Sequence, residues 1–305
     1  MDLKRTIMIN FFKIVFKCLI ISIVTIYLLG LTLNSSYRNG EYFKTQWLSK
    51  IKNKKYDYIV VGNSRVEKSI SVSVFDQKVD TKGLNLGMEN TTFSTFYLML
   101  HLFFKNKNKA DYVLLEFDHH NYHNFKDKNQ SHLFIPQIND SDIYSTLVDI
   151  NSKYHIIRFL PFIGYGYYNF DWGIHNFLNQ KFKLFNFPFL ENGDTKTFTN
   201  YSTFTDTGRK ASYNYKSDLN KYFLKIKNLC EKNNSRLITF TAPFFDKNVE
   251  KGNIKDIKTI LSEHQIEYHD YSSLYFQRKD MFFDNNHLNR IGTTQFSKVL
   301  SELVE

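Results

Sequence analysis

The feature that most constrains the fold is a short apolar run that ends abruptly in a turn. Residues Tyr58 to Val61 are apolar and mostly β-branched or aromatic, and Gly62-Asn63-Ser64 follows them directly. Such a run, closed by a turn signal, is typical of a buried strand in a parallel sheet. Catalytic groups of open α/β sheets lie just beyond the carboxyl ends of these strands. Ser64 therefore occupies the position expected of a nucleophile.

Similar runs recur along the chain, with helical patterns between them. We expect strands at 56–61, 83–86, 111–117, 236–241 and 266–271, and helices at about 92–104, 219–230, 248–263 and 291–304. Strands that alternate with helices predict a mostly parallel sheet with helices on both faces. The predicted fold class is therefore α/β, with three α/β/α layers.

The same pattern divides the chain into four segments. Residues 1–36 are a membrane anchor with a short tail, 37–118 and 216–305 are the two halves of one α/β domain, and 119–215 interrupt it. The interruption is rich in aromatic residues, with Gly164-Tyr165-Gly166-Tyr167-Tyr168 near its middle. We expect an insertion or lid, whose aromatic side chains suit either stacking on sugars or core packing.

The first 36 residues predict a transmembrane helix. Lys4 and Arg5 precede an apolar stretch, and Cys18 to Leu33 carries no charge. This stretch is long enough for the roughly 30 Å hydrocarbon core of a bilayer. The alternative is a cleaved signal peptide, but its apolar core is usually about 7–15 residues and ends in a small-residue cleavage site. The leading basic residues favour a single-pass protein of the cell membrane with residues 37–305 extracytoplasmic.

Composition restricts the partners further. The formal net charge of +10 permits anionic lipid, acidic glycan or nucleic acid. Basic residues are scattered and no zinc-finger or RNP pattern occurs, so no nucleic-acid partner is expected. The basic cluster Lys50 to Lys55 ends a polar, helical connector (37–55), where it contacts anionic lipid or is solvated. Cys18 lies in the apolar stretch, so a disulfide with Cys230 is not expected.

A second motif supplies what a serine nucleophile needs. A serine hydroxyl becomes reactive when a base accepts its proton and a third group holds the imidazole in the right tautomer. In Asp284-Asn285-Asn286-His287 the spacing brings a carboxylate back toward an imidazole. Each motif alone is commonly a turn or a helix cap. Together, each beside a strand end, they predict the catalytic residues Ser64, His287 and Asp284.

The motifs resemble those of the SGNH (GDSL-like) hydrolase superfamily. Gly62-Asn63-Ser64 corresponds to its first block, Gly87 in Asn85-Leu86-Gly87 to its second, and Asp284-x-x-His287 to its last, so that the likeness spans 56–118 and 216–305. Within the superfamily, the anchor and the G-x-S-R and N-L-G motifs are most similar to membrane-anchored envelope proteins. Those proteins act in O-acylation of exopolysaccharide or cell-wall polymer, including teichoic-acid D-alanylation.

This resemblance implies an SGNH/flavodoxin-like fold and ester chemistry that needs no cofactor and no metal. Ser64 would be the nucleophile, His287 the general base and Asp284 its orienting group, with the amides of Ser64 and Gly87 donating to the oxyanion. The implied partners are an acylated glycan or polysaccharide, membrane lipid and a membrane acyl-donor protein. Hydrolysis and transfer of the acyl group both remain open. The alternative function is a non-catalytic glycan-binding or assembly protein with a degenerate SGNH fold.

The third block departs from the superfamily pattern. The superfamily places an oxyanion-donating asparagine after the third strand, whereas here Asp118-His119-His120 follows and Asn121 has a different offset. A metal site is an alternative use of this loop, with Asp118, His119, His120 and His123 as ligands, but we interpret it as a polar loop. Arg65 and Lys68 flank the serine, where each either holds an anionic substrate or is solvated.

Overall fold

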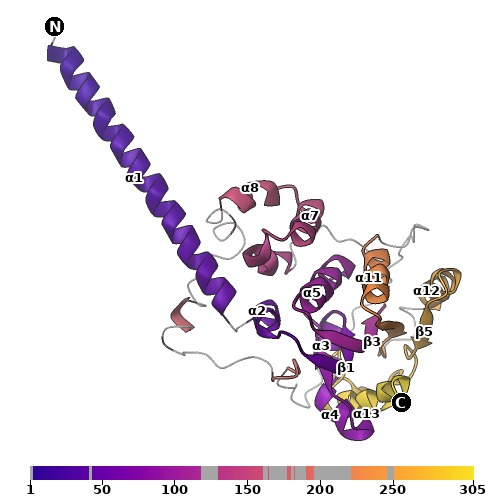
Figure 1. Cartoon of the computed structure of the whole chain (residues 1–305). Coiled ribbons are helices and arrows are strands. Elements are labelled where there is room, and N and C mark those ends of the chain that lie inside the picture. Colours follow the sequence, from indigo (N-terminus) through magenta and orange to yellow (C-terminus); the bar gives the residue numbers. More distant parts are fainter. Residues whose placement is uncertain are drawn as a thin grey trace. The chain divides into compact units, whose positions relative to one another are not determined.

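A computed structural model of the chain describes residues 3–40, 43–117, 130–160, 164, 177–179, 182, 190–195, 221–245 and 251–305 (Figure 1). The chain divides into two compact units. The anchor unit comprises Met1–Gly40 and His132–Asn186, and the sheet unit comprises Glu41–Ser131 and Phe187–Glu305.

The sheet unit is built on five parallel strands in the order β2-β1-β3-β4-β5. Their bounds are Lys55–Val61 (β1), Gly83–Asn85 (β2), Lys109–Glu116 (β3), Arg236–Thr241 (β4) and Glu267–Asp270 (β5). All five strands expected from the apolar runs are present, and the prediction of an α/β fold with a parallel sheet is confirmed.

Helices pack on both faces of this sheet (Figure 1). The first face carries α3 (Ser64–Ser69), α4 (Val72–Val79) and α13 (Arg290–Leu300), and the second carries α5 (Phe93–Lys105) and α11 (Lys221–Lys232). In addition, α2 (Lys44–Lys50) contacts α5, and α12 (Lys251–Glu263) contacts β5. Short 3-10 turns at Lys279–Met281 and Ser301–Leu303 flank α13.

Alternation of side chains along β1 explains why both faces are covered. Tyr58 and Val60 belong to the apolar cluster formed with α3, α4 and α13, and Tyr58 stacks on Phe75 of α4 at a ring separation of 3.9 Å. The intervening Ile59 and Val61 are equally buried. A strand that is apolar on both faces is characteristic of the centre of a parallel sheet.

The strand order reverses at β1. The chain passes from β1 to β2 on one side and then crosses back to β3 on the other. The carboxyl ends of strands at such a reversal border a crevice that binds ligands in open α/β sheets. Gly62-Asn63-Ser64 follows β1 and Glu116 ends β3. The predicted nucleophile therefore lies at the reversal point.

The anchor unit begins with α1 (Leu3–Asn39). Its segment Lys4–Ser36 has a mean hydropathy of 2.5 and is long and apolar enough to cross a membrane, by length and composition. Most of its large apolar side chains are exposed. The predicted N-terminal apolar helix is therefore present.

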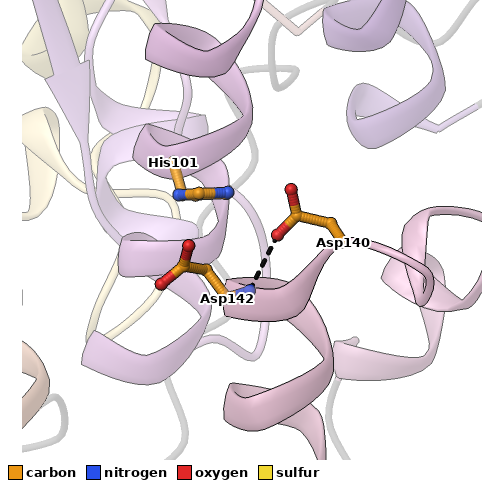
Figure 2. Close-up of side chains that lie close together, drawn as sticks. All are labelled: His101, Asp140 and Asp142. Carbon is orange, nitrogen blue, oxygen red and sulfur yellow. Dashed lines mark hydrogen bonds between the residues drawn. The ribbon is translucent and has the colours of Figure 1, made fainter.

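The anchor unit also contains helices where the sequence suggested little regular structure. These are η1, a 3-10 helix (Ser131–Gln137) whose first residue belongs to the sheet unit, α7 (Ser141–Ile150) and α8 (Tyr154–Phe159). Figure 2 shows Asp140 at the start of α7, where its carboxylate accepts the amides of Asp142 and Ile143 at 2.9 Å each. This is an ordinary N-cap, and it fixes where α7 begins.

The last described part of the predicted insertion, residues 190–195, belongs to the sheet unit. The buried carboxylate of Asp194 accepts the amides of Val72 and Ser73 at 2.8 and 2.9 Å, and the hydroxyl of Ser71 at 3.0 Å. Asp194 thus caps the first turn of α4 from a distant part of the chain, because an acidic group is favourable at a helix N-terminus.

Candidate active site

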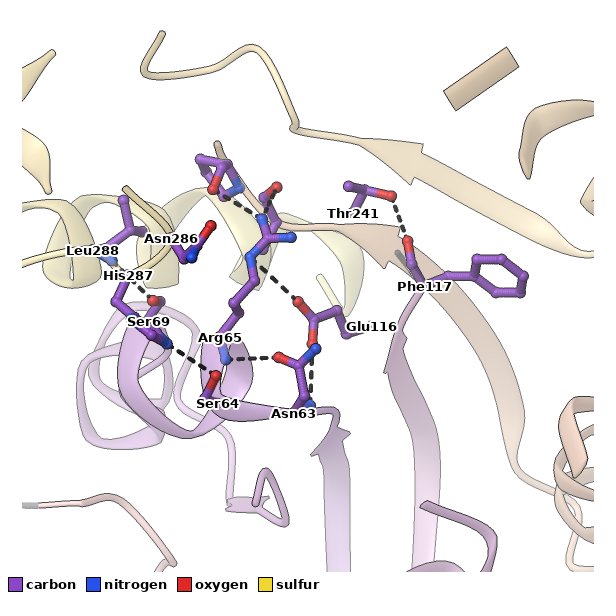
Figure 3. Close-up of polar contacts among 12 residues, drawn as sticks. Asn63, Ser64, Arg65, Ser69, Glu116, Phe117, Thr241, Asn286, His287 and Leu288 are labelled. Atoms are coloured by element: carbon purple, nitrogen blue, oxygen red, sulfur yellow. Dashed lines mark hydrogen bonds and ion pairs between the residues drawn. The ribbon is translucent and has the colours of Figure 1, made fainter. Parts of the chain in front are cut away.

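Three side chains form a continuous hydrogen-bonded chain beyond the carboxyl end of β1. His287 Nε2 lies 2.9 Å from Ser64 Oγ, as drawn in Figure 3. His287 Nδ1 lies 3.0 and 2.9 Å from the two carboxylate oxygens of Asp284. These distances are within hydrogen-bonding range. The three residues predicted from two distant motifs therefore meet, in the order that a serine triad requires.

The nucleophile position depends on a tight turn from strand to helix. Ser64 is the first residue of α3, and Asn63 caps the helix by accepting the Arg65 amide at 2.8 Å. A Cβ at Gly62 would lie 2.6 Å from Glu116 Oε2, so this position has no room for a side chain. The turn leaves Ser64 half-buried, with its hydroxyl directed at His287.

The loop that carries the base and the acid is held by its own backbone and by α3. Asp284 Oδ1 accepts the amides of Asn286 and His287, both at 2.8 Å. The following amide, of Leu288, donates to Ser69 Oγ at 3.1 Å (Figure 3). The imidazole is therefore positioned against the same helix that begins with Ser64.

The ionisation of Asp284 selects the histidine tautomer. Burial acts to raise the pKa of this carboxyl group, but hydrogen bonds from the His287 side chain and the Asn286 amide outweigh it, and the pKa is lowered. A charged carboxylate only accepts hydrogen bonds, so the proton of neutral His287 is on Nδ1. Nε2 is then the acceptor for the Ser64 hydroxyl, as a general base requires.

A buried ion pair lies beside the nucleophile turn (Figure 3). Arg65 Nε is 3.7 Å from Glu116 Oε1, and the two side chains are 3% and 0% exposed. Glu116 Oε2 accepts the Asn63 amide at 3.1 Å, while Arg65 donates to the carbonyls of Ala242 and Pro243. The pair thus joins the ends of β1, β3 and β4. Both interpretations of Arg65, as an anion holder or as a solvated residue, are wrong because it is buried within the protein.

The other flanking cation, Lys68, forms an ion pair with Glu89 at 2.9 Å, and its side chain is 22% exposed.

The loop that departs from the superfamily pattern begins at Asp118. Residues 118–129 lie outside the described residues. The roles suggested for this loop, as metal ligands or as an oxyanion donor, therefore remain predictions. The residues concerned are Asp118, His119, His120, Asn121 and His123.

The second block has a different geometry from the one the resemblance implies. The Gly87 amide donates to Asn85 Oδ1 at 2.9 Å. Asn85 Nδ2 in turn donates to the carbonyls of Val66 and Ile70, at 3.3 and 3.0 Å, which fixes the orientation of the carboxamide. An oxyanion would compete with Asn85 for the Gly87 hydrogen. The Ser64 amide, by contrast, has no acceptor among the residues the structure describes.

A buried lysine supports this block, and the sequence did not single it out. Lys44 is the first residue of α2, is 4% exposed, and donates to the Gly87 carbonyl at 2.6 Å and to Asn85 Oδ1 at 3.4 Å. Burial lowers its pKa to about 8, although the nearby carboxylates of Glu67 and Asp194 act in the opposite direction. A lysine in a polar connector gives no sequence signal of such burial.

A cavity of about 510 Å³ borders the nucleophile's helix but is separate from the triad. Its lining includes Lys68 of α3, Arg290 and Thr293 of α13, and Asp194. Ser64, Asp284 and His287 are not among its lining residues.

In comparisons with known proteins, no protein-family model matches the chain and no curated protein matches it significantly. The assignment of a function therefore depends on the geometry of this site and on its motifs.

Proposed function

We propose that this protein is a membrane-anchored serine esterase or O-acyltransferase of the SGNH type. The observation that carries the proposal is the hydrogen-bonded chain Asp284–His287–Ser64 at the point where the strand order reverses. The blocks around Ser64 and His287 favour the SGNH type and its three-layer arrangement over the α/β-hydrolase type, whose elbow ends in a glycine where this chain has Val66.

In the first half-reaction, Ser64 Oγ attacks the carbonyl carbon of an acyl ester while its proton passes to His287 Nε2. The Asp284 carboxylate stabilises the imidazolium that forms. The Ser64 amide donates a hydrogen bond to the carbonyl oxygen as negative charge develops there, and one such donor contributes about 2.7–4 kcal/mol. When the ester bond breaks, the departing alcohol takes the proton from His287 and an acyl-Ser64 remains.

In the second half-reaction, His287 removes a proton from the acceptor, whose oxygen attacks the acyl-serine. If the acceptor is water, a carboxylic acid is released and the protein is an esterase. If it is a sugar hydroxyl, a new ester forms and the protein is an acyltransferase. In both cases the proton returns from His287 to Ser64 Oγ, so the same three residues serve either outcome.

The proposed setting follows from α1. We propose that α1 crosses the cell membrane with its basic N-terminus in the cytoplasm, so that the sheet unit is extracytoplasmic. There it would act on acetyl-like esters of an envelope or extracellular polysaccharide. If it is a transferase, the acyl group would come from a donor protein in the same membrane.

One observation favours the alternative function, a non-catalytic glycan-binding or assembly protein. The Gly87 amide is engaged by Asn85, so that only the Ser64 amide is left as an oxyanion donor among the groups of these two blocks. A single donor stabilises the tetrahedral intermediate less than a pair does. Turnover is therefore the deciding measurement.

The test uses the purified full-length chain with a chromogenic acetyl ester and a fluorophosphonate probe. We expect turnover and labelling in the wild type, and loss of both in Ser64→Ala. In His287→Ala both should fall to near background, and Asp284→Asn should lower kcat by roughly 10⁴-fold, because its amide no longer holds the required tautomer.

The matched control is Ser262→Ala, which removes an exposed hydroxyl of α12 and should leave activity unchanged. Labelling that persists in Ser64→Ala would refute the assignment of the nucleophile. A wild type that binds glycan but shows neither turnover nor labelling would establish the binding protein instead.

A further inference from the structure

The short helix α8 exposes apolar side chains on its outer face. Ile156 is 56%, Phe159 72% and Leu160 47% exposed, whereas Tyr154 and Ile157 hold the helix to its own unit with almost no exposure. The preceding helix α7 follows the usual pattern of a soluble helix, with polar residues outward and apolar residues inward. The exposure of α8 is therefore not a general property of this part of the chain.

The described residues of the two units also differ in how many large apolar side chains they expose. Outside α1, the anchor unit exposes five large apolar side chains: Ile156, Phe159, Leu160, Phe177 and Phe182. The much longer described part of the sheet unit exposes three: Leu190, Leu274 and Ile291. Of these, Ile156, Phe159 and Leu160 are neighbours on α8 and at its C-terminal end, and a contiguous apolar patch of this kind marks a surface that contacts another apolar phase.

The charge of α8 is complementary to an anionic bilayer. The stretch 153–160 contains Lys153 and Arg158 and no acidic residue. The Arg158 guanidinium lies over the ring of Tyr144, 4.3 Å from its centroid. Basic groups beside exposed Ile, Phe and Leu are typical of helices that lie in the interface of an anionic bilayer.

We infer that α8 is a second membrane contact, which lies in the headgroup region of the bilayer that α1 enters. Ile156, Phe159 and Leu160 face the acyl chains, Lys153 lies at the level of the lipid phosphates, and Arg158 packs on Tyr144 of α7. We assign the apolar face of α8 to lipid, and not to a second protein, because α8 belongs to the same compact unit as the apolar helix α1. The inference is independent of the chemistry proposed for Ser64.

The experiment places one environment-sensitive nitrobenzoxadiazole (NBD) probe on the full-length chain in vesicles of phosphatidylcholine and phosphatidylglycerol. The chain has two cysteines, Cys18 exposed in α1 and Cys230 buried. The test protein is Phe159→Cys with Cys18→Ser. We expect blue-shifted emission that is quenched by doxyl groups on the lipid and not by iodide in the water.

Two matched proteins control the measurement. NBD on native Cys18 reports the lipid contact of α1, and NBD on Leu274→Cys with Cys18→Ser reports an apolar position of the sheet unit that is 41% exposed. Leu160→Cys serves as the second variant if Phe159→Cys does not fold. Iodide quenching equal to that at 274, measured at position 159 or, where Phe159→Cys does not fold, at position 160, would overturn the inference. So would protection from both quenchers, which would indicate a protein partner or a second copy.

The contribution of charge to the lipid contact of α8 is tested separately. Replacement of phosphatidylglycerol by phosphatidylcholine should weaken lipid quenching at position 159. Lys153→Gln should weaken it in the anionic vesicles and leave it unchanged in vesicles of phosphatidylcholine alone. Quenching that does not respond to either change would overturn the placement of Lys153 at the lipid phosphates.

Discussion

At the scale of single residues, the charged groups around the nucleophile make most of their contacts within the protein and so stabilise its fold. Arg65 and Glu116 are almost completely buried and connect three strand ends. Lys44 is buried behind the second block. A buried ion pair is costly to break, because the partner left behind is an uncompensated charge in a medium of low dielectric constant. These residues therefore bear first on stability, and on activity through the position of Ser64.

Glu116→Gln tests the buried pair. Glutamine keeps the shape and an acceptor for the Asn63 amide but removes the charge that lies 3.7 Å from Arg65 Nε, so we expect the free energy of unfolding to fall by about 3–5 kcal/mol. Chemical denaturation of the full-length chain measures the change. Glu89→Gln, which removes the more exposed partner of Lys68, is the control and should cost about 0–1 kcal/mol. Equal effects of the two substitutions would contradict the role given to Glu116.

Lys44 predicts a dependence of stability on pH. Its pKa is lowered from 10.5 to about 8 in the folded chain. Below pH 8 both states bind the proton and the penalty of burying the charge is complete. Between pH 8 and 10.5 the unfolded state alone binds it, so this residue makes stability rise with pH, by about 1.4 kcal/mol per unit. The difference in unfolding free energy between wild type and Lys44→Met should follow this rise. A difference that is constant from pH 7 to 11 would contradict it.

At the scale of elements, the site depends on two short helices that are stabilised by residues outside them. α3 has six residues and α4 has eight, lengths at which an isolated helix is not stable in water. Asn63 caps α3, and Asp194 caps α4 from a segment more than a hundred residues away in sequence. Tertiary contacts, rather than helix propensity, therefore set the position of Ser64.

Asp194→Ala measures the cap of α4. Its carboxylate accepts two backbone amides and the hydroxyls of Ser71 and Ser73, all of which would lose their partner. We expect a loss of about 3 kcal/mol in unfolding free energy, since hydrogen bonds to a charged group are the strong ones. Asp140→Ala, at the more exposed start of α7, should cost about 1 kcal/mol. The prediction fails if the α7 substitution is the more damaging of the two.

These helices also show what a sequence can and cannot predict. The strands were predictable because each is a compact apolar run. The triad was predictable because a serine follows the first strand and a distant D-x-x-H motif offers a base with its carboxylate, although that motif follows a 3-10 turn (Lys279–Met281) and not a strand. The helices α3 and α4 were not, since Ser64-Arg65-Val66-Glu67-Lys68-Ser69 has no apolar period of its own. Arg65, Glu116 and Lys44 gave no sign of burial because their partners lie 41 to 178 positions away in the chain.

At the scale of the whole molecule, the chain joins a long apolar helix to a parallel sheet that bears a triad. The helix is long enough to span a bilayer and the sheet unit has the core of an independent domain. The membrane span that we propose for α1 would confine the proposed chemistry to the surface of one compartment. The side of the membrane on which the triad lies is therefore the property of the whole molecule that most needs measuring.

Cysteine labelling in intact cells measures it. In a Cys18→Ser background, Leu274→Cys should react with a membrane-impermeant maleimide because residue 274 is exposed on the sheet unit. Thr6→Cys, near the basic N-terminus, should react only after permeabilisation. Cys230 is buried and should remain silent. The reverse pattern would place the triad in the cytoplasm.

The position of Lys44 has a consequence for any soluble form of this protein. It lies four residues after Gly40, where the first segment of the anchor unit ends, yet it donates hydrogen bonds to Asn85 and Gly87 next to the nucleophile's helix. A proteolytic cut just after Gly40 would leave the sheet unit intact, still joined to residues 132–186 of the anchor unit, whereas a cut after Lys44 would remove part of the support of the site. An inactive fragment could therefore lack activity because it has lost Lys44, and its inactivity would not show that the proposed enzyme requires the membrane.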